Sequence, residues 1–247
     1  GEYEDARHPK EVQFTSNLLE DLKRRDFTIN AMAYNDEAGL VDPFNGMDDI
    51  KKRKIRCVGK VQDRFSEDAL RILRAIRFAT QLDFSIDSDT KIWIESMYGF
   101  LKNVSKERIN NEFCKIVASE NFFYRLILND YLFIMLIPEI RPMINFPQNN
   151  PYHIYDVWKH TLEVVRYCKT SDMITKLAAL FHDIGKPHCY QDDEDGIRHF
   201  KGHGKVSAEM ADVIMRRFRF DNDTREKVVE LVRYHDSTIE VGEKYIK

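Results

Sequence analysis

Apolar residues recur at two spacings along the chain, and the spacing changes near residue 66. Residues 27–60 carry short apolar runs separated by turn-forming residues, which predicts strands. These runs are Phe27-Thr28-Ile29, Ala31 to Tyr34, Leu40-Val41 and Ile55 to Val58. From Ser66 onward the spacing follows one face of a helix, with apolar residues at Ala69, Ile72, Leu73, Ile76 and Ala79. We expect Ser66 to cap this helix, with Glu67 and Asp68 in its first turn.

Helical periodicity continues through most of the remaining sequence. A second capped helix is predicted to begin at Ser105, and aromatic-rich helical sequence runs to Ile137. Four of the seven prolines lie between residues 138 and 151, which predicts a boundary because closely spaced prolines break helices. Amphipathic helices are predicted beyond it, over 154–168, 173–184, 205–219 and 224–235. The pattern predicts an α+β protein that is mostly α, with a mixed sheet in its N-terminal part.

Composition narrows the class of protein. The chain has 247 residues, of which 43% are apolar, enough for packed cores and against a disordered chain. No apolar run approaches the ~18 residues of a transmembrane helix, and the first ten residues lack the apolar region of a signal peptide. Four cysteines without CxxC spacing predict reduced thiols in a soluble, cytoplasmic protein, not a disulfide framework or zinc ribbon.

Positive charge is concentrated in one segment. The whole chain has a net charge of −3, but residues 51–80 hold ten basic and three acidic side chains, a net charge of +7. A block of this kind favours a polyphosphate or RNA backbone as ligand, because such contacts are ionic. The alternative is a solvated basic face.

The helix predicted from Ser66 carries groups suited to reading a base. An Asp and an Arg one helical turn apart can present an acceptor beside a donor. Cytosine and adenine both show an amino group beside an unprotonated ring nitrogen, so Asp68 and Arg71 together would accept C and A and reject G and U. Arg74 and Arg77 could hold phosphate oxygens. The alternative is that Asp68 or Glu67 simply pairs with Arg71 on an exposed helix.

Four longer runs carry a family resemblance. RRDFTINAMAYN, GLVDPFNGMDDI, DRFSEDALRILRAIRFA and SKERINNEF closely resemble the neck and late head of bacterial tRNA nucleotidyltransferases, the class II CCA-adding enzymes and their poly(A) polymerase relatives. The resemblance implies that neck residues pair with incoming CTP or ATP as a protein template for addition to tRNA. The implied nucleotide-binding residues are Arg25, Asp68, Arg71, Arg74 and Arg77, with Asp26 and Asn30 on the ribose side.

The metal-binding part of that head has no match in the sequence. In the family, a glycine-rich turn precedes a D-x-D pair that holds two Mg²⁺ ions. Asp87-Ser88-Asp89 and Asp221-Asn222-Asp223 fit D-x-D but lack this lead-in, and we interpret both as loop or helix-start signals. We therefore expect the chain to belong to a longer enzyme, to lack the Mg²⁺ carboxylates, and not to add nucleotides by itself.

A second group of residues suggests a metal site. His160, His182-Asp183 and Asp236 lie on separate predicted helices, and adjacent His and Asp side chains can both reach one cation. Imidazole and carboxylate ligands favour Mn²⁺, Ni²⁺, Co²⁺ or Mg²⁺ over a thiolate-type zinc site. A cation held in this way can activate water against a phosphate ester.

These residues also lie in recognisable runs. HTLEVVRYC, LAALFHDIGKP, HGKVSAEMA and LVRYHD resemble the HD phosphohydrolase superfamily, a module appended to many class II CCA-adding enzymes. His203 and His235 are possible further ligands or phosphate-binding groups, and Lys186 could neutralise phosphate. The other histidines, His8, His153, His188 and His199, are interpreted as ordinary surface or loop residues.

We expect four parts in the chain: a head remnant over 1–60, a neck over 61–100, a helical body over 101–145 and an all-α HD domain over 150–247. The favoured function is that of a parent enzyme adding 3′-CCA to tRNA from CTP and ATP, with no membrane partner. A poly(A) polymerase, or an A-only or CC-only adding relative, is the alternative within this class. Two other classes are an HD phosphohydrolase with an RNA-binding N-terminal part, and a tRNA-binding scaffold.

Overall fold

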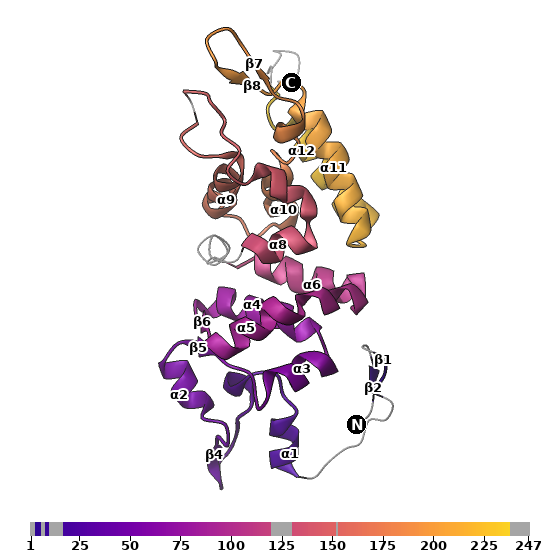
Figure 1. The fold of residues 1–247 in the computed structure, drawn as a ribbon. Helices are drawn as coiled ribbons and strands as arrows, with labels where there is room; N and C mark the ends of the chain where they lie inside the picture. The colour runs from indigo at the N-terminus through magenta and orange to yellow at the C-terminus, as the bar shows by residue number, and fades with distance from the viewer. Residues whose placement is uncertain (1–2, 6–7, 10–16, 120–129, 152, 238–247) are drawn as a thin grey trace, which may run out of the picture. The chain divides into compact units, whose positions relative to one another are not determined.

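The computed structural model describes residues 3–5, 8–9, 17–119, 130–151 and 153–237. The chain divides into two compact units, Gly1–Leu132 and Phe133–Lys247. Helices make up most of the described residues in both units, and the strands are short (Figure 1). The α+β, mostly α class predicted from the sequence is therefore confirmed. The four predicted domain ranges stay predictions.

Short strands and helices alternate in the first unit. Its described strands are β1 (Tyr3–Asp5), β2 (His8–Pro9), β3 (Ala33–Asn35), β4 (Gly39–Val41), β5 (Lys54–Ile55) and β6 (Ser85–Ile86). Its described helices are α1 (Leu18–Lys23), α2 (Gly46–Lys51), α3 (Val61–Glu67), α4 (Leu70–Leu82), α5 (Ser88–Met97) and α6 (Lys106–Val117), with 3-10 helices η1 (Thr28–Asn30) and η2 (Tyr98–Asn103). Helices α4 and α6 pack against each other.

The described strands of this unit pair two by two. β3 and β4 form an antiparallel hairpin in which Tyr34 lies opposite Leu40. β5 and β6 are parallel, with Ile55 opposite Ile86, and β1 and β2 are antiparallel. In place of one mixed sheet, the described residues of this unit contain separate two-stranded pairs, some antiparallel and one parallel. Because a pair of short strands is not stable alone, the helices must supply the core.

Helix α4 supplies a large part of that core. The face predicted from the sequence is buried, with exposed fractions of 6% or less at Ala69, Ile72, Leu73, Ile76 and Ala79. An apolar stripe of this width fixes which side of a helix faces its neighbours. The arginines of α4 are consequently left at the edge of the core, where they are partly buried.

The start of α4 differs from the prediction. Ser66 does not cap a helix; it lies within α3, and the chain breaks at Asp68, whose backbone is extended (φ −153°, ψ 102°). The Asp68 carboxylate accepts a hydrogen bond from the backbone N–H of Leu70 at 3.1 Å. A short acidic side chain can cap a helix in this way, so α4 begins at Leu70. Asp68 therefore lies in the break between two helices.

A buried polar network fixes the segment before the hairpin. The Asp49 carboxylate on α2 accepts a hydrogen bond from the Thr28 hydroxyl at 2.6 Å and from the Arg56 guanidinium at 2.9 Å. Asp49 and Thr28 are both buried. Since a buried carboxylate is expensive without partners, these contacts hold the loop around residues 26–30 in one position.

The second unit is helical apart from one small hairpin among its described residues. Its elements are α8 (Asp130–Leu136, which begins before the division), η3 (Pro138–Met143), α9 (Val157–Tyr167), α10 (Met173–Phe181), η4 (Lys186–His188), β7 (Gln191–Asp192), β8 (Arg198–His199), α11 (His203–Arg217) and α12 (Asn222–Tyr234). The four helices predicted after the prolines correspond to α9 to α12 and are confirmed. No described helix of the chain is both long and apolar enough to cross a bilayer.

Aspartates start several helices. The carboxylates of Asp156, Asp172 and Asp221 each accept a hydrogen bond from the backbone N–H three residues on, at the starts of α9, α10 and α12. Asp87 caps α5 by accepting from the N–H of Asp89. Both D-x-D sequences, interpreted from the sequence as loop or helix-start signals, are therefore helix starts, and their leading aspartates are used as caps.

An ion pair between α4 and α6 gives a test of the fold. Arg77 lies 2.6 Å from Glu112, and the two side chains are 12% and 5% exposed. We expect Arg77→Ala to lower the free energy of unfolding by about 3 to 5 kcal/mol, because it leaves a buried carboxylate short of a partner. Combining Arg77→Met with Glu112→Leu should restore most of this loss, as measured by urea unfolding.

The matched control is Lys52→Ala, which removes an exposed ion pair to Asp48 and should change stability by no more than about 1 kcal/mol. Equal effects of the two single substitutions would contradict the structural role of Arg77.

Candidate functional site

A pocket in the first unit gathers most of the predicted nucleotide-binding residues. It has a volume of about 540 Å³ and is lined by Arg24, Arg25, Asp26, Asn30, Asp68, Leu70, Arg71, Arg74 and Arg108. We call it the arginine pocket. Six of the seven residues assigned to the nucleotide from the sequence line it; Arg77 does not. With five arginines against two aspartates, its lining suits an anionic ligand.

Asp68 and Arg71 do not pair with each other. Asp68 Oδ2 accepts a hydrogen bond from Arg108 Nη2 at 2.7 Å. Arg71 pairs with Glu67 at 2.7 Å and donates to the backbone carbonyl of Arg24 at 3.0 Å. The Glu67–Arg71 pair considered as an alternative is thus present, but both Asp68 and Arg71 line the pocket.

The remaining predicted residues hold the pocket wall together. Arg74 Nε donates to Asp26 Oδ2 at 2.6 Å, and Asp26 is 7% exposed. Arg25 donates to the backbone carbonyl of Asn30 at 2.9 Å and pairs with Asp21 at 3.1 Å. These contacts tie the loop of residues 25–30 to helices α1 and α4, which gives the pocket a fixed shape.

Arg24, Leu70 and Arg108 line the pocket without having been predicted as site residues. Arg24 is the first residue of the RRD run, and Arg108 lies in the SKERINNEF run, so both were within the segments that carried the resemblance. The Nη1 atom of Arg108 is buried and has no hydrogen-bond partner. No periodicity relates Arg108 to Asp68, which is 40 positions away.

A second group of side chains converges in the second unit. It contains His160 on α9, His182 and Asp183 directly after α10, His203 at the start of α11 and His235 directly after α12. We call these five residues the histidine cluster. Two sets of possible ligand atoms share Asp183: His160, His182 and Asp183 form one, and Asp183, His203 and His235 form the other.

Asp183 is the centre of the cluster. Its Oδ2 atom lies 3.1 Å from His182 Nε2 and 3.5 Å from His160 Nε2. Its Oδ1 atom lies 3.3 Å from His203 Nε2 and 3.6 Å from His235 Nε2. Although this carboxylate is buried, neither oxygen accepts a hydrogen bond of good geometry. A divalent cation would satisfy it.

The histidine rings are oriented for metal binding. The Nδ1 atoms of His182, His203 and His235 lie 2.7–2.8 Å from the backbone carbonyls of Ala179, Phe200 and Val232. Because a carbonyl oxygen only accepts, each Nδ1 must donate its hydrogen. The Nε2 atoms are then left as lone-pair ligands facing Asp183, as in histidines that hold metals.

The pKa values fit this arrangement. Burial lowers the pKa of His160 to about 4, so its imidazole is neutral at pH 7. Burial alone would raise the pKa of Asp183, but hydrogen bonds from the imidazoles of His182, His203 and His235 outweigh it and hold the pKa well below its usual range. Burial alone would lower the pKa of His235, but its contacts with Asp183 and the Val232 carbonyl outweigh it and raise that pKa. A cation would compete with protons for these imidazoles, because neutral imidazole and ionised carboxylate are the forms that bind cations.

Gly185 allows the loop after α10 to approach α11. A Cβ atom at this position would lie 2.7 Å from the backbone nitrogen of Ser207, closer than packing permits. The Gly185 N–H donates to the Ser207 hydroxyl at 2.9 Å instead. This close approach lets His203, at the start of α11, face Asp183.

Other predicted groups lie around the cluster. Lys186 is buried, and its Nζ atom lies 2.7 Å from Asp183 Oδ2 and 2.8 Å from the Gln148 side-chain oxygen. Asp236 is in neither ligand set: its side chain is 48% exposed, and its Oδ2 atom lies 3.7 Å from His203 Nδ1. Its role as a ligand stays a prediction.

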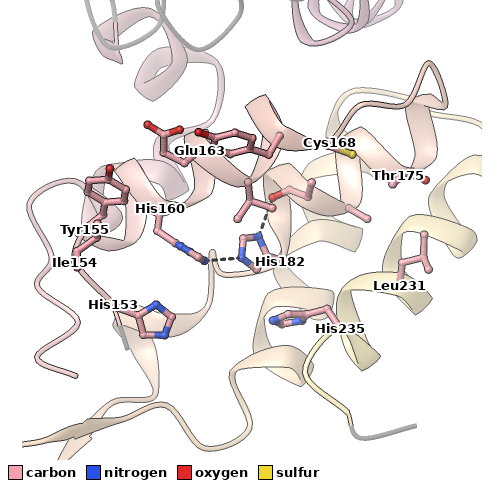
Figure 2. A pocket seen from close by; sticks show the side chains of 14 residues that line it. His153, Ile154, Tyr155, His160, Glu163, Cys168, Thr175, His182, Leu231 and His235 are labelled. Atoms are coloured by element: carbon pink, nitrogen blue, oxygen red, sulfur yellow. Dashed lines mark hydrogen bonds between the residues drawn. The ribbon is translucent and has the colours of Figure 1, made fainter. Parts of the chain in front are cut away.

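A large pocket adjoins the cluster, and its wall includes His153, His160, His182 and His235 (Figure 2). The rings of His153 and His160 meet edge to face with centroids 5.2 Å apart. His153 was interpreted as an ordinary surface or loop histidine; it does lie in a loop, but its place in this pocket was missed. Nothing in its local sequence marks it.

Three family models match the chain. They are the poly A polymerase head domain at residues 1–56, the probable RNA and SrmB-binding site of polymerase A at residues 83–144, and the HD domain at residues 152–244. The histidine cluster falls within the HD match. Of the arginine pocket, residues 24–30 lie in the head-domain match, Arg108 lies in the RNA-binding match, and residues 68–74 lie between the two.

Comparison with known proteins finds similarity to bacterial CCA-adding enzymes. The CCA-adding enzyme of Listeria monocytogenes is 50% identical over 117 residues, 47% of this chain and 30% of that protein. The CCA-adding enzyme of Lactobacillus delbrueckii is 48% identical over 119 residues. The chain thus spans about 30% of the length of these relatives. It is also similar to the Bacillus stearothermophilus CCA-adding enzyme in complex with CTP, with a TM-score of 0.59 and 26% identity, covering 89% of this chain and 47% of that one.

The chain is thus similar to CCA-adding enzymes over 47% of its length, and its residues 152–244 match the HD domain.

The shared position of Asp183 leads to a prediction about metal binding. We expect Asp183→Asn to weaken Mn²⁺ binding by more than the ~10- to 100-fold typical of losing a group that only supports a ligand, because it removes the one charge common to both sets. Isothermal titration calorimetry on the whole chain measures this.

The matched control is Asp193→Asn, which changes an exposed aspartate that pairs with a histidine outside the cluster, His199, at 2.8 Å. If both variants bind Mn²⁺ like the unaltered chain, the cluster is not a metal site.

Proposed function

We propose that the arginine pocket selects CTP and ATP for an enzyme that adds the 3′-CCA sequence to tRNA. The observation that carries this proposal is that the carboxylate of Asp68 and the guanidinium of Arg71 line one pocket together with Arg25 and Arg74. The identity to CCA-adding enzymes and the likeness to a relative solved with CTP support it.

Base selection rests on two hydrogen bonds. Asp68 accepts from the exocyclic amino group of cytosine or adenine, and Arg71 donates to the neighbouring ring nitrogen. Guanine and uracil present a carbonyl oxygen and a ring N–H at these positions. The carbonyl oxygen would face the acceptor Asp68, and the ring N–H would face the donor Arg71, so neither hydrogen bond could form. The same two contacts serve a poly(A) polymerase or an A-only or CC-only adding enzyme, which remain alternatives within this class.

The other pocket residues position the nucleotide. Arg25 and Arg74 lie where they can neutralise phosphate oxygens, and Asp26 and Asn30 form the ribose side of the pocket. Arg77 is not part of this proposal, because its ion pair with Glu112 lies outside the pocket. Mg²⁺ supplies the transfer chemistry in the family. Within the described residues, the carboxylates of the pocket, Asp26 and Asp68, are paired with arginines. We therefore propose that they bind and orient the nucleotide and do not hold the Mg²⁺ ions.

We also propose that the HD domain hydrolyses a phosphate ester. His160, His182 and Asp183 would hold one divalent cation, and Asp183, His203 and His235 offer a second set of ligands. A cation bound there would lower the pKa of a water molecule and polarise the phosphate. The chain's own contribution is to orient the imidazoles through backbone carbonyls. The Lys186 ammonium, paired with Asp183 at 2.7 Å, would add positive charge at the cluster that attracts a phosphate.

A stand-alone HD phosphohydrolase is the candidate from another class. The observation in its favour is that the histidine cluster lies wholly within the second unit, so its chemistry needs no residue from the first. In that case, the arginine pocket would be an RNA- or nucleotide-binding platform. A tRNA-binding scaffold and the expected cytoplasmic location also stay predictions.

Base selection is testable by substitution. We expect Asp68→Asn to reduce the preference for CTP and ATP over UTP and GTP by about tenfold or more, since a two-bond base contact discriminates by about 1–3 kcal/mol. Equilibrium binding of the four nucleotides to this chain measures selection. Incorporation into tRNA lacking CCA, with the natural full-length protein, measures its consequence.

Asp63→Asn is the matched control, because Asp63 is an exposed aspartate on α3 that does not line the pocket. Unchanged selectivity in Asp68→Asn would remove Asp68 from the proposed base contact.

A further inference from the structure

One aromatic ring contacts the arginine pocket from outside. Phe78 does not line the pocket, but it lies on α4 one helical turn after Arg74, which does. The Cζ atom of Arg74 lies over the Phe78 ring, 5.5 Å from its centroid. A guanidinium within about 6 Å of a ring centroid is attracted to the π face of the ring. Because residues four positions apart share one face of a helix, α4 itself brings the two side chains together.

The guanidinium of Arg74 needs this second contact. Its Nε atom donates to Asp26 Oδ2 at 2.6 Å, and no described residue accepts a hydrogen bond from its Nη atoms. A single hydrogen bond leaves a planar group free to rotate about the axis of that bond. The face of the Phe78 ring limits this rotation, because it attracts the flat guanidinium. Unlike a second carboxylate, the ring adds no negative charge that would repel a phosphate.

The Phe78 ring is itself fixed on two sides. It meets the fully buried ring of Phe27 edge to face, with centroids 5.7 Å apart. The Cζ atom of Arg77 lies 4.0 Å from the Phe78 centroid. Arg77 is in turn held by Glu112 on α6 at 2.6 Å and by Gln81 at 3.0 Å. The ring therefore has a fixed place from which it can orient Arg74.

Two consecutive residues carry both supports of Arg74. Asp26 accepts its hydrogen bond, and Phe27 packs against the ring of Phe78. The Phe27 N–H also donates to Asp26 Oδ1 at 3.0 Å. The carboxylate and the ring contact therefore keep one spacing, and the guanidinium of Arg74 is held at both places at once.

We propose that Phe78 is a positioning residue of the arginine pocket: its ring keeps the Arg74 guanidinium in the orientation that binds a nucleotide phosphate. The inference rests on the phosphate role proposed for Arg74 and adds a residue that does not touch the nucleotide. Arg77 enters the same arrangement as an anchor of the ring, although it lies outside the pocket. Base selection by Asp68 and Arg71 does not depend on Phe78.

The test compares CTP with cytidine, which has no phosphate, as ligands of the whole chain. Isothermal titration calorimetry measures CTP binding, and ligand-observed NMR measures cytidine binding. We expect Phe78→Leu to raise the Kd for CTP by about 2- to 5-fold, the value of one cation–π contact, and to leave the Kd for cytidine unchanged. Phe78→Tyr keeps the ring and should bind CTP like the unaltered chain.

The matched control is Phe84→Leu. Phe84 is also a partly buried phenylalanine beneath an arginine, Arg53, whose Cζ atom lies 5.8 Å from the ring centroid, but neither residue lines the pocket. This substitution should leave the Kd for CTP unchanged. If Phe78→Leu unfolds the chain, Phe78→Met replaces it, because the flexible methionine side chain fills irregular space in a core.

A double-mutant cycle separates positioning from a general loss of packing. If Phe78 acts through Arg74, Phe78→Leu should have no further effect on CTP binding in an Arg74→Ala background. Additive effects, or an equal weakening of CTP and cytidine binding, would overturn the proposal. If Arg74→Ala weakens CTP binding and Phe78→Leu does not, the positioning role alone fails. If Arg74→Ala leaves CTP binding unchanged, the phosphate role proposed for Arg74 fails, and this inference fails with it.

The contact can also be tested without a nucleotide. The ring current of Phe78 should shift the side-chain protons of Arg74 upfield in the NMR spectrum of the unaltered chain, and Phe78→Leu should remove this shift. If these protons resonate at the same positions in both proteins, the ring does not hold Arg74 and the proposal is wrong.

Discussion

A carboxylate that is removed from water must be matched by cations or donors, because an unpaired buried charge costs several kcal/mol. Both units are organised around such carboxylates. In the first unit, Asp26 is matched by Arg74 and Glu112 by Arg77, and each pair ties α4 to a different segment. In the second unit, the Lys186 ammonium pairs with Asp183 at 2.7 Å, and imidazoles from four positions surround the same carboxylate. The need to match buried charge therefore fixes the same elements that form the two candidate sites.

The sequence predicted those features that depend on local spacing. The buried face of α4 followed from a 3.6-residue period. The two D-x-D sequences were interpreted as loop or helix-start signals, and both do start helices, α5 and α12. The joining of His160 with His182-Asp183 could be expected because the histidine and the H-D pair occur in recognisable runs. Periodicity and capping act over a few residues, so they can be read without knowing the rest of the fold.

Features that depend on contacts between distant segments could not be predicted in this way. Arg108 meets Asp68 from 40 positions away, and His153 meets His160 from a loop without a local signal. The break before α4 was missed because Ser66 is as good a cap as Asp68 when only sequence is considered. The choice between them is made by tertiary packing: Val61 and Phe65 on α3 are both buried, which extends α3 through Ser66.

The two oxygens of Asp68 have separate partners, and this division bears on turnover. One oxygen accepts from the N–H of Leu70 at the start of α4, and the other accepts from Arg108. Under the proposed base contact, a base that binds the oxygen held by Arg108 would share or displace that hydrogen bond, so the net gain would be smaller than the strength of the new bond. Such a competition would keep the affinity for any one nucleotide modest. When the base leaves, Arg108 would restore the original pair, so the contact would be as easily released as it is formed.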